Sequence, residues 1–288
     1  METIRDCCFE GERPLFASSD LRLENVQFYP GDSALKESQH IAAVDCLFMG
    51  RYPFWHTERT RLSNCHFTAA SRDALWYASE VRMVDTVVEA PRMFRQVRQL
   101  HLENSRLTNA AECGWNCRDV VFHQVELRGG DYLLLNSQYI DLEGCRLQGN
   151  YALQDTREVV VRDTTIESND AFWNTENVTV YDSILVGECL GWHSKNLRLV
   201  NCTIHGTQPL CYAKNLVLEN CTLVETDRCF EYSTLQAQIN GDILSVKNPT
   251  SGCITARSIG ELILDEHCLD PGACRISTAD AVPYPSVS

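Results

Sequence analysis

Positive charge is scarce in this chain of 288 residues. Lys and Arg account for 25 residues and Asp and Glu for 39, which gives a formal net charge of −14. Proteins that bind nucleic acids carry a clustered positive surface that displaces counterions from the phosphates. The composition therefore argues against a nucleic-acid partner.

Long hydrophobic runs are also lacking. No stretch approaches the roughly 18 consecutive apolar residues of a membrane-spanning helix. Residues 1–16 lack the apolar core and the cleavage site of a signal peptide. We therefore expect a cytoplasmic protein with no membrane partner. The 15 cysteines, an odd number, fit reduced thiols in that compartment better than a disulfide framework.

The chain contains an internal repeat of about twenty residues. Each copy reads apolar, any, apolar, any, Asn or Asp, small, any, apolar. Eleven copies start at Leu21, Ile41, Thr60, Val81, Leu100, Val120, Ile140, Val159, Val178, Leu197 and Leu216. Successive starts lie 19, 20 or 21 residues apart. This regularity indicates a solenoid in which each copy is one structural rung.

The columns of the repeat indicate its local structure. Alternating apolar and polar residues at the start of each copy predict a strand with one buried face. The Asn or Asp column, which departs only at Gln124 and Gly144, predicts a tight turn in every rung. A third short strand is expected six residues before each start, where Leu35, Phe54 and Leu75 provide inner side chains.

Three short strands per rung predict an all-β fold, a single-domain right-handed parallel β-helix of about 11 to 12 rungs of 19–21 residues. We expect the β-helix to cover residues 1–270 and residues 271–288 to form an irregular tail or cap. Pentapeptide repeats fit less well, because an interval of 19 residues is not divisible by five. Unpaired strand edges at the solenoid ends make a homo-oligomer an expected assembly.

Several segments carry a resemblance to known proteins. They include GERPLF from Gly11, DAFWNTENVTVYDS from Asp170, LGWHSKNLRLVNCTI from Leu190 and SIGELILD from Ser258. The sequence resembles right-handed parallel β-helix proteins of the pectin-lyase-like superfamily and, more closely, an uncharacterised bacterial family known only as a domain of unknown function. The resemblance implies the fold and no established activity. The Asp, Arg and Lys constellations of the superfamily's lyases and galacturonases are not intact.

All five Trp residues occupy one column of the repeat. Five residues before a start lie Trp55, Trp76, Trp115, Trp173 and Trp192. Lys36, Arg95 and Gln154 share this column, so strand alternation places it on the outer surface. The resemblance implies that this sheet forms a polysaccharide groove in the superfamily. Rows of exposed aromatic rings suit the apolar faces of sugars. The rings could instead pack inward, or lie under adjacent loops, as ladders that hold the rungs in register.

Residues beside the Trp column are candidates for contact with the same saccharide. They are Tyr77, Asn136, Asn174, His193 and Tyr212. An exposed turn is the alternative role for the polar members of this set.

A candidate catalytic group interrupts the Trp column. Asp155 and Glu176 lie one rung apart and two positions out of step, so their backbones are on the order of 8 Å apart. Two carboxylates at that separation suit acid and base catalysis at a glycosidic bond, and Arg157 lies beside them. The alternative is that these positions form a polar turn in every rung.

No metal site and no cofactor are expected. Cys46, Cys65, Cys202 and Cys221 fall in the inward small column, where a thiol acts as a small hydrophobic group. The leading hypothesis is therefore a carbohydrate-binding or carbohydrate-processing β-helix, whose partner is a neutral or weakly charged oligo- or polysaccharide. The alternative is a non-enzymatic structural or interaction scaffold in which the Trp column is a packing feature.

Overall fold

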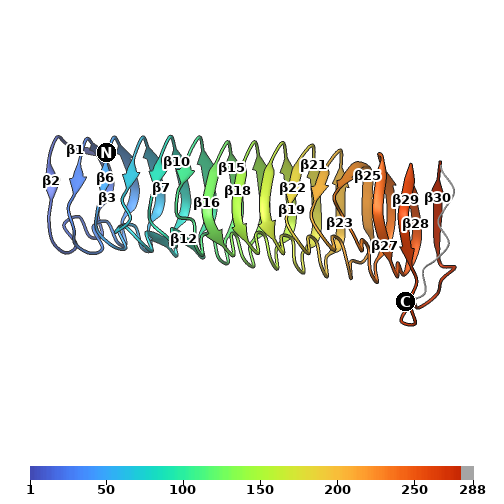
Figure 1. The fold of residues 1–288 in the computed structure, drawn as a ribbon. Helices are drawn as coiled ribbons and strands as arrows, with labels where there is room; N and C mark the ends of the chain where they lie inside the picture. The colour runs from blue at the N-terminus through green and yellow to red at the C-terminus, as the bar shows by residue number, and fades with distance from the viewer. Residues whose placement is uncertain (280–288) are drawn as a thin grey trace. The chain divides into compact units, whose positions relative to one another are not determined.

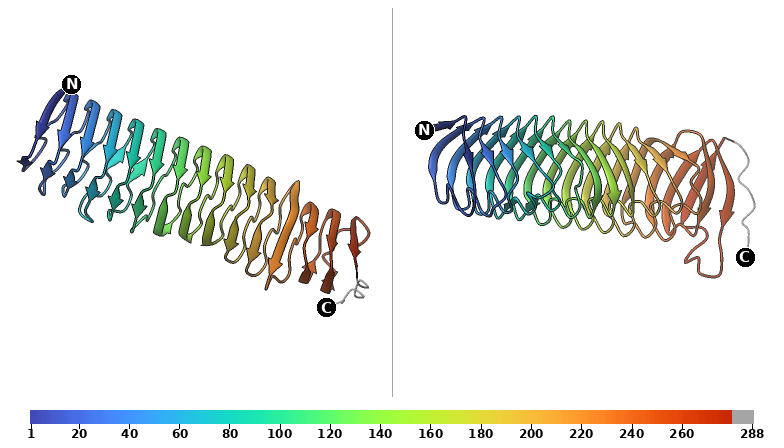
Figure 2. Two further views of the ribbon diagram at one scale, coloured as in Figure 1. Left: turned by 90° about the horizontal axis from the view of Figure 1, so that it is seen from above. Right: turned by 60° about the vertical axis from the view of Figure 1, so that its left-hand side comes forward.

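The computed structural model describes residues 1–279, and all regular structure in them is β-strand. The chain divides into two units, Met1–Gly149 (unit 1) and Asn150–Ser288 (unit 2). Within each unit, the strands of successive rungs lie side by side and run parallel (Figures 1 and 2). The fold class predicted from the repeat, a parallel β-solenoid, is confirmed. The described residues contain no helix that could span a membrane.

Each rung has three faces, which we call A, B and C. Face A carries the longest strands. In unit 1 these are β1 (Glu2–Arg5), β3 (Ser19–Glu24), β5 (Gln39–Val44), β7 (Glu58–Ser63), β10 (Ser79–Val84), β13 (Arg98–Glu103), β15 (Arg118–His123) and β17 (Gln138–Glu143). In unit 2 they are β19 (Arg157–Arg162), β21 (Glu176–Tyr181), β23 (Lys195–Val200), β25 (Leu216–Val224), β26 (Thr234–Ile239), β28 (Ser251–Ala256) and β30 (Cys274–Thr278).

Face B follows face A after two residues, and most of its strands are shorter. They are β2 (Cys8–Phe9), β4 (Gln27–Phe28), β6 (Leu47–Phe48), β8 (His66–Phe67), β11 (Val87–Val88), β14 (Arg106–Leu107), β16 (Glu126–Asp131), β18 (Arg146–Asn150), β20 (Thr165–Asn169), β22 (Ile184–Val186) and β24 (Thr203–His205). Face C is mostly turn, with strands β9 (Leu75–Trp76) and β12 (Phe94–Arg95) in unit 1 and β27 (Asp242–Lys247) and β29 (Ser258–Ile263) in unit 2.

The register of face A confirms the repeat residue by residue. Leu21 pairs with Ile41 and Ile41 with Thr60 in unit 1. Val159 pairs with Val178 and Val178 with Leu197 in unit 2. Register is strongly specified because a slip of one residue would turn every buried side chain outward.

The rungs are more numerous than the repeat predicted. Face A has eight strands in unit 1 and seven in the described part of unit 2, against 11 to 12 expected. The added rungs break the sequence pattern: β1 starts with the polar Glu2, which pairs with Leu21. Leu235 pairs with Gly252 and Gly252 with Cys274, so the interval changes to 17 and then 22 residues.

Part of the segment expected as an irregular tail forms a strand. Within residues 271–288, Cys274–Thr278 form β30, which pairs with β28 along face A. Residues 280–288 of that tail lie outside the described residues.

The core of each unit is a set of stacked columns. In unit 1, Phe9, Phe28, Phe48 and Phe67 stack with ring centroids 5.4, 5.1 and 4.7 Å apart. The Cys residues of the small column are buried as predicted, and all 15 thiols are free. Burial raises the pKa of Cys113 and Cys117 to about 12, which keeps these thiols protonated and unreactive at neutral pH.

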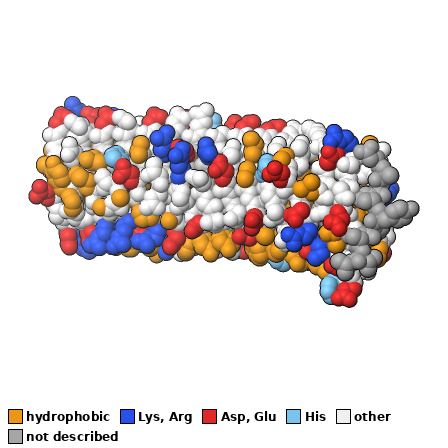
Figure 3. Space-filling view, in the orientation of Figure 1, with side chains coloured by type: hydrophobic (Ala, Val, Ile, Leu, Met, Phe, Trp, Pro, Cys, Tyr) orange, Lys and Arg blue, Asp and Glu red, His pale blue; other side chains and the backbone are white. Residues whose placement is uncertain are grey.

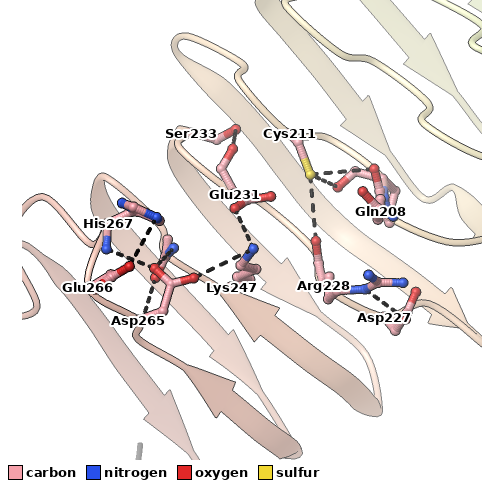
Figure 4. A network of polar contacts seen from close by, with 12 residues as sticks. Gln208, Cys211, Asp227, Arg228, Glu231, Ser233, Lys247, Asp265, Glu266 and His267 are labelled. Carbon is pink, nitrogen blue, oxygen red and sulfur yellow. Dashed lines mark hydrogen bonds and ion pairs between the residues drawn. The ribbon is translucent and has the colours of Figure 1, made fainter. Parts of the chain in front are cut away.

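A polar network joins the irregular last rungs of unit 2 (Figure 4). Glu231, which is nearly buried, lies 2.8 Å from the Lys247 Nζ atom, and Asp265 lies 3.6 Å from it. Asn248 Nδ2 donates to Asp265 Oδ1 at 2.7 Å. These charges are paired with one another, so the network stabilises the rungs instead of presenting an open site.

The Asn or Asp column forms the tight corner between faces A and B. Asn201 has a φ of 55°, in the left-handed region. Its Nδ2 donates to Asp182 Oδ1 at 2.8 Å, and its Oδ1 accepts from Asn220 Nδ2 at 2.7 Å. Asn tolerates this backbone conformation better than most residues, so one side chain satisfies both the turn and the ladder.

Two substitutions at Asn201 separate the contribution of its left-handed backbone conformation from that of its ladder hydrogen bonds. Asn201→Ala loses the ladder bonds and strains the left-handed backbone, so we expect a loss of about 2 kcal/mol in the free energy of unfolding. Asn201→Gly loses only the ladder bonds and should cost about 1 kcal/mol. Urea unfolding measures both, with exposed Gln236→Ala as the control. Equal losses for Ala and Gly would contradict a role for backbone conformation.

Candidate functional site

The Trp side chains lie on the outer surface of face C and are half-buried. In unit 1 they belong to a continuous stack. The rings of Trp55 and Trp76 are 5.4 Å apart and 9° from parallel. The Arg95 guanidinium lies 4.3 Å from the Trp76 ring centroid and 4.6 Å from that of Trp115. Lys36 lies 5.8 Å from the Trp55 ring on the other side. Cations thus fill two of the positions of the column that lack Trp.

Unit 2 repeats this arrangement over two rungs. The rings of Trp173 and Trp192 are 5.4 Å apart and 28° from parallel. The Tyr212 ring lies edge-on to Trp192 at 5.1 Å. The predicted outward direction of the column is therefore correct, and its rings contact one another.

The indole nitrogens of four Trp residues are bonded to the backbone of the following rung. Trp76 Nε1 donates to the Arg92 carbonyl at 2.8 Å, and Trp115 Nε1 donates to the Tyr132 carbonyl at 2.9 Å. Trp192 does the same. Stacking covers ring faces, and these bonds fix the rings against the rung. The faces that a sugar would need for stacking are therefore largely occupied.

The next column along the chain forms a corner with positive φ. Tyr77 and Tyr212 adopt φ values of 62° and 58° without being glycine. His56 stacks on Tyr77, and His193 stacks on Tyr212, each pair with centroids 4.9 Å apart. These stacks offset part of the cost of the left-handed backbone, which is about 1–2 kcal/mol per residue.

Amides occupy the same corner where aromatic residues are missing. Asn136 Nδ2 donates to Asn116 Oδ1 at 2.7 Å in unit 1, and Asn174 Nδ2 donates to Asp155 Oδ1 at 2.6 Å in unit 2. The structure therefore places the predicted binding residues of this column in ladders that link successive rungs.

The two candidate catalytic carboxylates have separate partners. Asp155 accepts from Asn174 and from Gln154 Nε2 at 3.1 Å. Glu176 accepts from Lys195 Nζ at 2.7 Å, and Arg157 Nε lies 3.9 Å from it. Their proposed acid and base roles stay a prediction.

Electrostatics at Glu176 favour the ionised form. Its pKa lies below the ordinary value of 4.5, mainly because Lys195 donates a hydrogen bond to it and adds a positive charge. A general acid in glycoside hydrolysis needs a raised pKa. Of the two roles, the lowered pKa of Glu176 favours that of the base.

A surface depression in unit 2 brings several predicted residues together. Its volume is about 330 Å³, and its lining consists of Arg157, Asn174, Thr175, Glu176, His193, Lys195, Tyr212 and Lys214. Five of these were predicted from the sequence; Thr175, Lys195 and Lys214 were not. The Trp rings and Asp155 are not part of the lining, and Tyr77 and Asn136 belong to unit 1.

Sequence reasoning missed a larger groove on face A of unit 1. It has a volume of about 800 Å³, and its lining includes Arg22, Ala42, Arg59, Arg61 and Arg82. Basic side chains gather locally on unit 1 in spite of the acidic net charge (Figure 3). The signal was Ala42, a short side chain between Arg22 and Arg61 in the same column of the repeat. Residues 1–279 contain no cluster of three His, Cys, Asp or Glu side chains suited to a metal ion.

Removing the Lys195 ammonium tests the electrostatics at Glu176. In Lys195→Gln, we expect the Glu176 pKa to rise toward 4.5, because the charged donor is lost. Carboxyl NMR titration measures this value. The lowered pKa means that the pair contributes stability above pH 4.5, which is lost as the pH falls through the folded pKa. An unchanged Glu176 pKa in the variant would exclude Lys195 as the cause.

Structural comparison finds several solved structures of low similarity. The periplasmic alginate epimerase AlgG is 10% identical, with 96% of this chain and 76% of that chain covered and a TM-score of 0.38. PfbA, a surface adhesin of Streptococcus pneumoniae, is 8% identical over 99% of this chain and 85% of that chain, with a TM-score of 0.34. The A-module of the Azotobacter vinelandii mannuronan C-5 epimerase AlgE4 is 12% identical over 100% and 91%, with a TM-score of 0.27. Likeness at this level carries no information about function.

Sequence comparison is more decisive about the family. No curated protein matches the chain. A family model described as "Protein of unknown function (DUF3737)" matches residues 2–277, which is nearly the whole chain. This agrees with the resemblance seen in the sequence, and the chain belongs to the DUF3737 family of proteins of unknown function.

Proposed function

We propose that this protein is a non-enzymatic binding scaffold in which the Trp column holds successive rungs in register. The observation that carries the proposal is that neighbouring side chains cover the faces of the Trp rings. Trp76 lies between Trp55 and the Arg95 guanidinium, which in turn lies against Trp115. Rings stacked in this way contribute packing energy and cannot also offer both faces to a sugar.

The charged groups beside the column support the same proposal. Glu176 is bonded to Lys195, and Asp155 is bonded to Asn174 one rung away. Each contact links one rung to the next. Such contacts suit a rigid surface for a partner better than a pair of carboxylates that exchange protons with a substrate.

A second candidate function is saccharide binding in the depression of unit 2. Its lining combines hydrogen-bond donors and acceptors. Arg157, Lys195 and Lys214 donate, and Glu176 accepts. The Asn174 amide and the Tyr212 hydroxyl can do either. Sugar hydroxyls need such mixed partners. The volume of about 330 Å³ is at the lower end for a ligand site, so a short neutral or weakly charged oligosaccharide is the ligand class that fits.

Truncation of two Trp residues tests the packing role. We expect Trp115→Ala and Trp173→Ala each to reduce the free energy of unfolding by about 2–3 kcal/mol, less than for a fully buried Trp because both rings are half-buried. Chemical denaturation measures the loss. Leu244→Ala, an exposed residue of unit 2, should change stability by less than about 0.5 kcal/mol. Near-neutral Trp variants would contradict the packing role.

Two matched amide variants test the saccharide candidate. Asn174→Gly and Asn136→Gly both keep the positive φ of the corner and remove a ladder amide, but only Asn174 lines the depression. For a saccharide identified on a glycan array, we expect Asn174→Gly to weaken binding about tenfold, the value of one hydrogen bond.

Asn136→Gly should bind that saccharide like the wild type in calorimetric titration. Equal weakening in both variants would place the effect in the fold and not in the depression. An array with no bound saccharide would remove this candidate and leave the scaffold proposal standing.

A further inference from the structure

The groove on face A of unit 1 is locally basic in an acidic protein. Its lining contains four arginines, Arg22, Arg59, Arg61 and Arg82, and one carboxylate, Glu80. The strands β3, β7 and β10 provide these residues, and β5 lies between β3 and β7. Their outward direction follows from alternation, because Leu21, Leu23, Val81 and Met83 on either side of Arg22 and Arg82 are buried.

Arg61 is the central residue of the groove. Within residues 1–279 the structure shows no ion pair or side-chain hydrogen bond for it, whereas each of the other three arginines has a carboxylate partner. Arg22 pairs with Glu24 at 2.5 Å, Arg82 with Glu103 at 3.1 Å, and Arg59 with Glu58 at 3.6 Å. The positive charge of Arg61 is therefore the one in this groove that lacks a partner among the described residues.

The register places two like charges directly opposite each other. Arg61 pairs with Arg82 across β7 and β10. Adjacent strands lie about 4.8 Å apart, and like charges at opposed positions destabilise a sheet. A bound anion between or beside these guanidinium groups would remove that repulsion.

Ala42 opens the space that an anion would need. It lies on β5 between Arg22 of β3 and Arg61 of β7, with backbone pairing to both. Its methyl group leaves a gap between two arginines that are two strand spacings, or about 10 Å, apart. Arginine side chains are long enough to converge on one group in such a gap, and the guanidinium fork matches phosphate and sulfate oxygens.

The carboxylate partners of the other three arginines make no ion pair with Arg61. His40 lies on the gap side of β5 and contacts Asp20 at 2.5 Å. Glu80 is the carboxylate on the groove lining, and Ser63 is the uncharged residue that follows Arg61 on the same face. Ser63 can add a hydroxyl donor to a bound oxyanion.

We propose that the groove at Ala42 and Arg61 is a binding site for a tetrahedral oxyanion, a phosphate or sulfate group. This inference concerns unit 1 and does not rest on the proposed function. The oxyanion arrives either free or as a monoester on a sugar. Arg61 binds it directly, and Arg22 and Arg82 complete the site from the neighbouring strands.

Calorimetric titration with two probes tests the proposal. The probes are inorganic phosphate and glucose 6-phosphate, with glucose as the uncharged control. We expect both charged probes to bind the wild type at low ionic strength and glucose to show no binding at this groove. Equal affinity for the two charged probes indicates the free anion as the ligand, and tighter binding of glucose 6-phosphate indicates an ester.

Two variants within the groove and one outside it complete the test. Arg61→Gln should weaken both charged probes at least tenfold, and its melting temperature should not fall because repulsion with Arg82 is relieved. Ala42→Glu fills the gap with a negative charge and should abolish binding. Arg275→Gln is the matched control, since Arg275 is an exposed arginine of face A in unit 2.

Three results would overturn the proposal. The first is a wild type that binds neither charged probe. The second is an Arg61→Gln variant that binds both as tightly as the wild type does. The third is an equal loss of affinity in Arg275→Gln, which would show that the anions bind through unspecific charge.

Discussion

Every position of the repeat must be compatible with its own copies in the neighbouring rungs. Parallel strands about 4.8 Å apart bring equivalent residues into direct contact, so the fold selects side chains that interact favourably with themselves. Phe stacks on Phe in the core of unit 1, and Asn donates to Asn or Asp at the corners. The same rule governs the outer columns, where Trp stacks on Trp.

This constraint gives a physical reason for the Trp column and for its interruptions. A ring can stack on another ring or on a cation, and Arg95 takes the place of a ring between Trp76 and Trp115. Aromatic residues at a regular spacing are therefore expected in a solenoid even without a ligand. What marks a binding surface is an outer position whose stacking or pairing is left incomplete.

The two surface features of interest satisfy that criterion to different degrees. In the depression of unit 2, Glu176, Lys195 and Asn174 already have partners in adjacent rungs, so a ligand there would compete with contacts of the fold. In the groove of unit 1, Arg61 faces Arg82 and a short Ala42. There, like charges occupy paired positions of adjacent strands, and a bound anion would remove their repulsion. The acidic net charge makes such a local basic surface more distinctive.

The sequence by itself determined the register, the inner columns and the corner residues, because a one-residue slip would expose the whole core and only a few residues tolerate the corner backbone. Strand alternation favoured an outward Trp column but left inward packing open. The sequence failed at the end rungs, where Glu2 replaces an apolar start and the interval departs from 19–21 residues. Only the tertiary structure decided which faces and charges stay open. Whether Trp76 is covered, or Arg61 unpaired, depends on the rotamers and lengths of side chains in adjacent rungs, and no single column of the repeat contains that information.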